Sequence, residues 1–366
     1  MLDYNLLEPM PTLHHPNVHA PWSKWSEDQT LHVAGVYSNP FRWRNRRQLF
    51  NDFVRHMRAT PNVALHVVEL AYGDRPFEVT EDDDPLSISI RLRTDCEMFH
   101  KENLINLAVR SFPPGWKYGG YSDGDFHFTR HDWALEAIHM LQHHEFVQLF
   151  SNYADVTSST ATSDTGHRMF RGNSSFAWNY LHQPEFKALK QKQQATDPYY
   201  GLPLPSAEFP FGFPPGAPGG AWAWRRGAFD TVGGMLDTCV MGSADWWMAF
   251  GLIGQQTMLR GDATIRSYND EIRNWQRRAR ALTANIGCVD NFALHFWHGA
   301  SSSRAYGNRE NILIDFKFDP RYDITKDWQG VYRWTGNKPR LRDAVRRYFI
   351  NRMEDAPSPH GKVGLP

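Results

Sequence analysis

The sequence predicts one α/β domain with a doubly wound sheet. Short apolar runs alternate with segments of helical spacing over the first 150 residues, and the first runs end in Gly, Pro, Asn or Asp. Strands that alternate with helices indicate parallel β-α-β units. In such sheets, ligands bind beyond the carboxyl ends of the strands. Any site is therefore expected at those ends.

The expected elements follow from composition and periodicity. Strands are expected at 31–38, 63–70, 86–92, 116–122, 146–150 and, late in the chain, 292–297. Helices are expected at 46–58, 97–109, 131–144, 226–232, 244–253, 268–282 and 339–353, the last of them basic and amphipathic. The elements before residue 336 together predict one α/β domain over 31–335.

Three segments break this pattern. Residues 1–30 are expected to form an irregular arm, and residues 336–366 a helical tail. Residues 155–220 are first rich in Ser and Thr and then in Pro, Gly and Phe. This stretch is too long for an ordinary connection, so an insertion or a lid over the ligand is expected there.

Composition limits the class of protein. Forty basic residues balance forty acidic ones, so no overall charge indicates a polyanionic partner. The three cysteines are scattered, and neither a signal peptide nor a membrane span is recognisable in the sequence. We therefore expect a cytoplasmic protein without a membrane partner. The fourteen tryptophans suit either a sugar-binding site or simply a Trp-rich core.

Two aspartates directly follow the predicted strand 116–122, in the tripeptide Asp123-Gly124-Asp125. Side chains alternate along an extended segment, so both carboxylates point the same way, and Gly124 would let a ligand approach the backbone. Two carboxylates in one cleft repel each other unless a cation lies between them, and a hard divalent cation bound to a diphosphate is a natural occupant. A solvated turn is the alternative, and the position after a buried strand favours the metal site.

Other chemistry-bearing residues lie near strand ends or helix starts. Asn39, Glu69 and Arg93 fall at the ends of the first three predicted strands. His298 ends the late strand, and it is predicted as the third metal ligand; His295 ranks below it, and a buried core histidine is the alternative for both. Asp245 opens a predicted helix, either as a general base or as a helix cap.

These segments together resemble the family-2-type glycosyltransferases of GT-A fold. The resemblance rests on the Asp-Gly-Asp after a strand, on residues 220–234 with an aspartate after them, and on the late His-Phe-Trp-His. More closely, the chain resembles phage-encoded members of that group. Their pattern runs through residues 37–43, 69–77, 100–103, 304–309, 327–330 and 336–339, so the likeness spans about 31–353.

The resemblance implies a fold, an activity and site residues. The fold would be a GT-A (Rossmann-like) mixed sheet flanked by helices. Asp123 and Asp125 would hold Mn²⁺ or Mg²⁺ against a nucleotide-sugar diphosphate, and His298 would complete the metal shell. Asp245 would be the base of an inverting transfer, although many relatives carry an acidic pair where Trp246 follows here. The donor, expected to be a UDP-sugar, would contact Asn39, Glu69, Arg93, Asn103, Arg304 and Arg309. For the two late arginines, a surface salt bridge is the alternative.

The acceptor is open to several interpretations. Trp222, Trp224 and Trp246 would offer aromatic faces to it. Two basic clusters, within 42–47 and 338–352, favour DNA with 5-hydroxymethylpyrimidines, reached by base flipping in the host cytoplasm if a phage encodes the chain. A virion protein or a surface glycan is the alternative acceptor. A glycan-binding module without activity and a nucleotidyltransferase are alternative functions, but the latter should carry a Gly-rich loop after the first strand, and 38–41 is not one.

Overall fold

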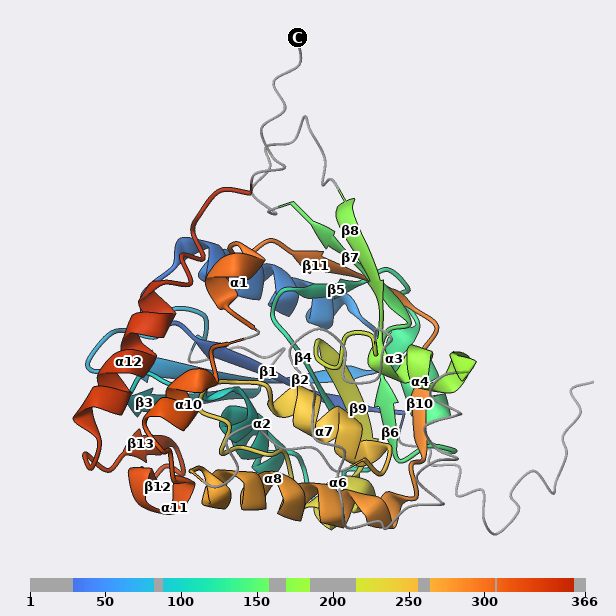
Figure 1. Cartoon of the computed structure of the whole chain (residues 1–366). Coiled ribbons are helices and arrows are strands. Elements are labelled where there is room, and N and C mark those ends of the chain that lie inside the picture. The colour runs from blue at the N-terminus through green and yellow to red at the C-terminus, as the bar shows by residue number, and fades with distance from the viewer. Residues whose placement is uncertain are drawn as a thin grey trace, which may run out of the picture.

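The computed structural model describes residues 29–81, 88–157, 169–184, 215–255, 264–306 and 308–358, and its centre is a seven-stranded sheet (Figure 1). The strand order is β10-β6-β9-β4-β1-β2-β3. Strands β1, β2, β3 and β4 are parallel, whereas β9 runs antiparallel to both of its neighbours. The strands are β1 (Leu31–Ser38), β2 (Val63–Tyr72), β3 (Ile88–Thr94), β4 (Tyr118–Ser122), β6 (Phe146–Gln148), β9 (Ala221–Arg225) and β10 (Ile286–Cys288). The expectation of a mixed α/β sheet is confirmed.

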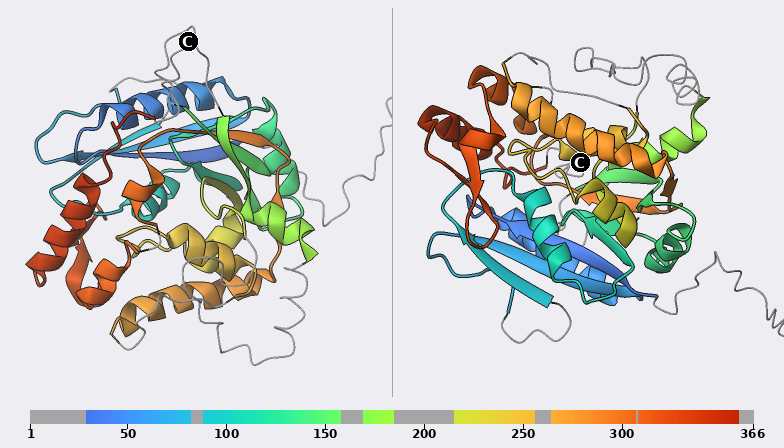
Figure 2. Two further views of the ribbon diagram at one scale, coloured as in Figure 1. Left: turned by 45° about the horizontal axis from the view of Figure 1, so that its top comes forward. Right: turned by 90° about the horizontal axis from the view of Figure 1, so that it is seen from below.

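Helices cover both faces of this sheet (Figure 2). Successive residues of β1 enter different cores: Val33 packs in a cluster with Phe53, whereas Ala34 belongs to the cluster of Leu104. The first face carries α1 (Arg44–Ala59) and α3 (Trp133–Met140). The second carries α2 (Lys101–Arg110), α6 (Arg226–Val232), α7 (Ala244–Leu252) and α8 (Arg266–Ala279), which a 3₁₀ turn (Arg280–Leu282) extends. A strand buried on both faces explains the largely apolar run at 31–36, which only His32 interrupts.

A second, four-stranded sheet lies beside the first. Its order is β5-β11-β7-β8. The strands are β5 (Phe126–Phe128), β7 (Asn152–Val156), β8 (Met169–Ser174) and β11 (Phe292–Phe296). The late strand expected at 292–297 therefore exists, but it belongs to this second sheet.

The remaining elements surround these two sheets. They are α4 (Phe176–His182), α9 (Ser301–Arg304), α10 (Asn311–Asp315), α11 (Pro320–Asp323), the hairpin of β12 (Ile324–Lys326) and β13 (Tyr332–Trp334), and α12 (Pro339–Ile350). No helix among the described residues is both long and apolar enough to cross a bilayer.

Several boundaries differ from expectation, and two segments differ most. The helix expected at 97–109 begins at Lys101, and before it the N–H of Phe99 donates to the carbonyl of Val240, far along the chain, and not to a helix carbonyl. Within 155–220, β8 and α4 are regular elements, so the segment is not uniformly irregular. The rest of that expected insertion, 158–168 and 185–214, and most of the expected arm, 1–28, lie outside the described residues.

The expected C-terminal helix is present as α12, and its apolar face packs into the main core. That face is formed by Leu341, Val345, Tyr348 and Phe349. After α12 the chain returns to the amino-terminal end of α1. There, the Asp355 carboxylate accepts hydrogen bonds from the backbone N–H groups of Arg44 and Asn45, at 3.1 and 2.9 Å. The tail thus supplies a cap that α1 lacks locally, since Trp43 makes no side-chain cap bond.

Candidate metal centre and anion pocket

A pocket of about 230 Å³ lies at the carboxyl ends of β1 and β4. These strands are parallel neighbours, so their ends meet at the same edge of the sheet. Ser38 at the end of β1 lines the pocket, as do the three residues that follow β4, Asp123 to Asp125. The expectation that a pocket lies beyond the strand ends is confirmed in this respect.

The Asp-Gly-Asp turn joins the two sheets. The N–H of Phe296 in β11 donates to the carbonyl of Asp125 at 2.9 Å, which ties the turn to the strand that carries His295. A Cβ on Gly124 would lie 2.8 Å from Phe50 of α1. The glycine therefore makes room for helix packing, and it also lines the pocket, as its expected role beside a ligand requires.

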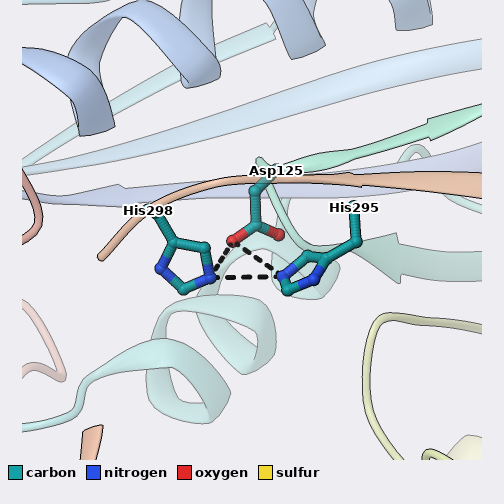
Figure 3. Close-up of side chains that lie close together, drawn as sticks. All are labelled: Asp125, His295 and His298. Atoms are coloured by element: carbon teal, nitrogen blue, oxygen red, sulfur yellow. Dashed lines mark hydrogen bonds and ion pairs between the residues drawn. The ribbon is translucent and has the colours of Figure 1, made fainter. Parts of the chain in front are cut away.

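Three side chains meet beside this turn: Asp125, His295 and His298 (Figure 3). The Oδ2 atom of Asp125 lies 3.1 Å from Nε2 of His298 and 3.8 Å from Nε2 of His295. The two Nε2 atoms are 3.2 Å apart. One carboxylate and two imidazoles at this separation form a set that could hold a metal ion.

The hydrogen bonds around the histidines indicate which ring atoms carry protons. The Nδ1–H of His295 donates to Oδ1 of Asp155 at 2.6 Å, and Asp155 is in turn paired with Arg171. These two partners lower the pKa of Asp155 against the opposing effect of its burial. On the other ring, Nε2 of His298 must accept from Arg304 at 2.9 Å, because a guanidinium only donates. If both imidazoles are neutral, the two Nε2 atoms that face each other are therefore unprotonated, and each carries a lone pair.

When the His295 ring is neutral, three lone-pair donors thus face one another: Nε2 of each histidine and Oδ2 of Asp125. Burial lowers the pKa of His298 well below its ordinary value, and the neighbouring Arg304 cation lowers it further, so this ring is neutral. The second carboxylate oxygen of Asp125, Oδ1, is buried and has no hydrogen-bond partner among the described residues. Such an arrangement is costly without a cation. The residues present therefore fit a divalent metal ion.

Asp123 lies in the same pocket but outside this cluster. Its carboxylate pairs with Lys101, the first residue of α2, at 3.3 Å. Burial raises the pKa of Asp123 to about 6, although Lys101 acts in the opposite direction. Burial also raises the pKa of the adjacent Glu102 to about 7. A lysine opposes the dipole at the start of a helix, and Asp123 compensates for it here.

Two buried arginines, Arg304 and Arg309, also line the pocket. Their side chains belong to residues that are 5% and 7% exposed, and within the described chain neither has a carboxylate within 4.0 Å. Their guanidinium carbons lie 5.3 and 4.9 Å from the ring centroid of one residue, Tyr306. The expected alternative of surface salt bridges does not hold for either. A buried cation without an anionic partner is suited to an anionic ligand.

Asp245 lies in the first turn of α7 and lines the same pocket. Its Oδ1 accepts from the N–H of Trp246 at 2.9 Å, so the carboxylate has a local helix-terminal contact as well as access to the pocket. A Cβ on Gly219 would lie 2.3 Å from its other oxygen. The carboxylate is therefore held between the helix and Gly219, which lies two residues before β9.

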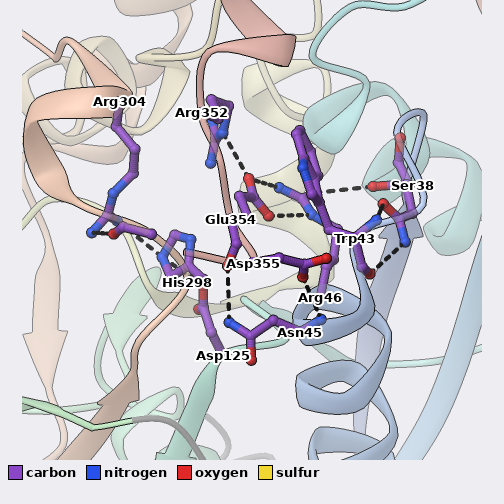
Figure 4. A network of polar contacts seen from close by, with 12 residues as sticks. Ser38, Trp43, Asn45, Arg46, Asp125, His298, Arg304, Arg352, Glu354 and Asp355 are labelled. Atoms are coloured by element: carbon purple, nitrogen blue, oxygen red, sulfur yellow. Dashed lines mark hydrogen bonds and ion pairs between the residues drawn. The ribbon is translucent and has the colours of Figure 1, made fainter. Parts of the chain in front are cut away.

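The tail after α12 forms one wall of the pocket (Figure 4). Glu354 accepts from Nε of Arg46 in α1 and from Nε of Arg352, both at 2.7 Å. Arg46 also donates to the carbonyl of Ser38 at 3.0 Å. These bonds join the first helix, the first strand and the end of the described chain.

Several donor candidates do not reach the pocket. Asn39 is buried and bonds to the backbone of Trp43, where it orders the entry to α1. Glu69 lies within β2 and accepts from the backbone N–H groups of residues 78–80. The guanidinium of Arg93 donates to the carbonyls of Gly73 and Arg75. Asn103 bonds to the backbone of the β12–β13 hairpin at positions 330 and 332. Each side chain supports a loop, since unpaired loop groups need partners.

The acceptor tryptophans are also not exposed to this pocket. Trp222 and Trp224 alternate along β9 toward the same core and are 5% and 0% exposed. They are core residues, and Gly120 on the neighbouring strand allows the two backbones to approach. Trp246 is half-buried and packs 4.9 Å from Phe250 of its own helix.

His295, which the sequence ranks below His298, takes an equal place in the cluster, and its signal was its spacing of three from His298 at the strand exit. The structure also adds residues that the sequence did not single out as site residues. Lys101 and Glu102 lie within the 100–103 motif, but nothing in a single sequence pairs that motif with Asp123. Asp155 and Glu354 approach the site from distant parts of the chain.

The chain matches no protein-family model, and no curated protein matches it. The case for a function therefore rests on the pocket itself and on the resemblance in motifs.

Proposed function

We propose that the protein is a metal-dependent glycosyltransferase that moves a sugar from a nucleotide-sugar to an acceptor hydroxyl. One observation carries this proposal: a cation-competent cluster, Asp125, His295 and His298, shares a pocket with two buried arginines that pair with no carboxylate of the described residues. The oxygens of a diphosphate can bind a divalent cation and arginines together. The motif resemblance to GT-A glycosyltransferases directs this choice toward a nucleotide-sugar, with a UDP-sugar as the first candidate.

The donor set favours Mn²⁺ over Mg²⁺. Mg²⁺ prefers oxygen ligands, whereas two of the three donors here are imidazole nitrogens. When bound, the cation would neutralise the charge that develops on the departing diphosphate. Asp125, His295 and His298 would hold it, and Asp155 would orient the His295 ring.

The other pocket residues take roles that follow from their charge. Arg304 and Arg309 would bind the phosphate oxygens. Asp245 would accept the proton of the acceptor hydroxyl, since it is a carboxylate in the same pocket with a fixed orientation. Attack from the face opposite the diphosphate would invert the anomeric configuration. The ion pair of Asp123 and Lys101 would lie beside the bound donor and determine the local electrostatic potential there.

The test is the release of nucleoside diphosphate from a panel of nucleotide-sugars with Mn²⁺. The wild-type protein should turn over at least one donor, and Asp125→Asn should lose this activity. Gly227→Ala is the matched control, because a Cβ there meets nothing within 4 Å. No turnover of any donor by the wild-type protein, or equal turnover by the Asp125 variant, would contradict the proposal. Binding of a sugar without turnover would instead favour a glycan-binding module.

For the acceptor, we propose a 5-hydroxymethylated pyrimidine in DNA. The two basic clusters lie together, since the guanidinium of Arg346 in α12 lies 5.6 Å from the ring of Phe41 beside α1. Arg340 and Arg347 on α12, and Arg44 and Arg47 on α1, are exposed. Others are paired with acids, such as Arg342 with Asp343. An exposed basic surface beside the pocket supports contact with a phosphate backbone.

Mass spectrometry of DNA and protein from cells that express the chain would identify the acceptor, with Asp125→Asn as the control. DNA with a hexose on a modified pyrimidine supports the proposal, as does DNA retention that weakens with salt. If the sugar is found on protein or on a surface glycan and the DNA is unmodified, DNA is not the acceptor. The proposed glycosyltransferase activity would still stand.

A further inference from the structure

The bond between Arg304 and His298 uses the atom that a metal ion would need. The Nη1 of Arg304 lies 2.9 Å from Nε2 of His298 (Figure 4). The same Nε2 faces Asp125 and His295 at 3.1 and 3.2 Å, so it is the atom through which His298 belongs to the cluster. A ring nitrogen has one lone pair in the ring plane. It can accept from a guanidinium or bind a cation, but not both.

Electrostatic repulsion also prevents a bound cation and the Arg304–His298 bond from being present together. A divalent ion held by Asp125, His295 and His298 would lie a few ångströms from the Arg304 guanidinium, and like charges at that distance repel strongly in a buried site. The occupied cluster and the Arg304–His298 bond are therefore mutually exclusive.

The contacts of Arg304 other than the one to His298 would let its side chain move. Its Nε is buried and makes no hydrogen bond within the described chain, and its remaining side-chain bonds are to neutral oxygens. Those to Gly299 and Ser301 are long, at 3.5 Å. The ring of Tyr306, which Arg304 shares with Arg309, lines the pocket as well. Both guanidiniums therefore lie beside one aromatic ring at the pocket, so one anionic ligand there could contact both.

We propose that Arg304 and the divalent cation compete for Nε2 of His298, so that metal binding releases Arg304 to hold the diphosphate that the metal recruits. The inference rests on the proposed function for the identity of the anion. It makes the binding ordered, with the metal before the anion. It also makes the two affinities depend on each other, because an anion that holds Arg304 removes the competitor from His298.

The test is calorimetric titration of Mn²⁺ alone into the wild-type protein, Arg304→Gln and Arg309→Gln. Arg304→Gln should bind Mn²⁺ about 3–10-fold more tightly than the wild type, because the competitor is gone. Arg309→Gln also removes a buried cation from the pocket, but Arg309 bonds to Ser243 and not to His298. Its Mn²⁺ affinity should stay within about twofold of the wild type.

Inorganic pyrophosphate is then titrated at one free Mn²⁺ concentration that saturates each protein. Both variants should bind it about tenfold or more weakly, since each has lost a phosphate-binding arginine. A crystal structure with Mn²⁺ should place the Arg304 guanidinium beyond hydrogen-bond distance of His298 Nε2. Loss of fold cannot imitate the result, because a misfolded variant would bind the metal less tightly.

Two outcomes would overturn the proposal, and they differ. If Arg304→Gln binds Mn²⁺ with equal or weaker affinity than the wild type, competition is refuted while the metal centre and the proposed function stand. If none of the three proteins binds Mn²⁺, the metal centre fails and the proposed function fails with it.

Discussion

The ring of His295 owes its orientation to one carboxylate, that of Asp155. The 2.6 Å bond keeps the proton on Nδ1 and leaves Nε2 facing the cluster. Such partners of a metal-binding histidine typically change metal affinity by 10–100-fold. Asp155→Asn is therefore expected to weaken Mn²⁺ binding by about tenfold or more by calorimetry.

The matched control is Asp132→Asn, which also removes an aspartate paired with an arginine, here on the surface. Its Mn²⁺ affinity should equal that of the wild type. If Asp155→Asn binds Mn²⁺ as the wild type does, His295 is not oriented by this bond.

Gly219 leaves the space in which the Asp245 carboxylate lies. A methyl group would come within 2.3 Å of Oδ2, and the backbone of Gly219 has no positive φ, so the substitution displaces the carboxylate without straining the chain. Gly219→Ala should lower nucleotide-sugar turnover about tenfold or more, with Mn²⁺ affinity unchanged, since general-base contributions are of order 10²–10⁴.

Gly227→Ala is again the control, because it lies inside α6 with open space around it. It should keep full turnover and gain about 0.5–1 kcal/mol of unfolding free energy. Unchanged turnover in the Gly219 variant would argue against a role for Asp245 as base.

The sequence could indicate the site but could not tell which partners each of its two aspartates contacts. Both Asp123 and Asp125 follow a buried strand, and only the structure pairs the first with Lys101 and the second with the histidines. Lys101 is 22 positions away in sequence, and a single chain carries no signal for that contact. The sequence likewise ranks His298 above His295 because His298 lies at the end of the predicted strand. In the structure, both rings face the same centre.

Elements with many residues were predicted well because their periodicity is long. Helix α1 and strand β1 follow directly from apolar spacing, and both have nearly the expected bounds. The short strands β5 and β10 have three residues each, too few to show a period. They exist because neighbouring strands supply their hydrogen bonds. The antiparallel direction of β9 could not be predicted either, because a buried strand has the same continuous apolar pattern whether it runs parallel or antiparallel to its neighbours.

The link between the tail and α1 depends on one buried carboxylate, Glu354. The Arg46 and Arg352 cations lower its pKa against the effect of burial. Glu354→Gln leaves two arginines without their anion, so at pH 7 it should lower the unfolding free energy by about 3 kcal/mol. Asp355→Ala removes only the cap of α1, and it should cost about 1 kcal/mol.

The pH dependence of that loss has a definite sign. A carboxylate whose pKa is lowered by folding stabilises the native state above its unfolded pKa, about 4.3 for Glu, and this contribution disappears as the pH falls through the folded value. The difference between wild type and Glu354→Gln should therefore shrink below about pH 4 in chemical denaturation. A constant difference from pH 7 to 3 would show that the carboxylate charge is not the cause.

At the scale of the whole molecule, the candidate metal centre joins the two sheets. Asp125 follows β4 of the large sheet, and His295 lies in β11 of the small one. An ion bound only by the native state stabilises it by about 2.7 kcal/mol at a hundred times Kd. Thermal unfolding should therefore shift upward by about 3–6 °C with Mn²⁺.

Asp125→Asn should remove the Mn²⁺ shift, and Mg²⁺ should give the wild type a smaller one, since two donors are imidazoles. Equal shifts in the variant and the wild type would mean that Mn²⁺ binds elsewhere.

The contact of residues 352–355 with α1 also sets an order in time. A ribosome delivers these residues after every other residue that lines the pocket. Until they arrive, α1 lacks its cap and Arg46 lacks its partner. A nascent chain that stops short of these residues therefore lacks one wall of the pocket, even when its sheet has formed.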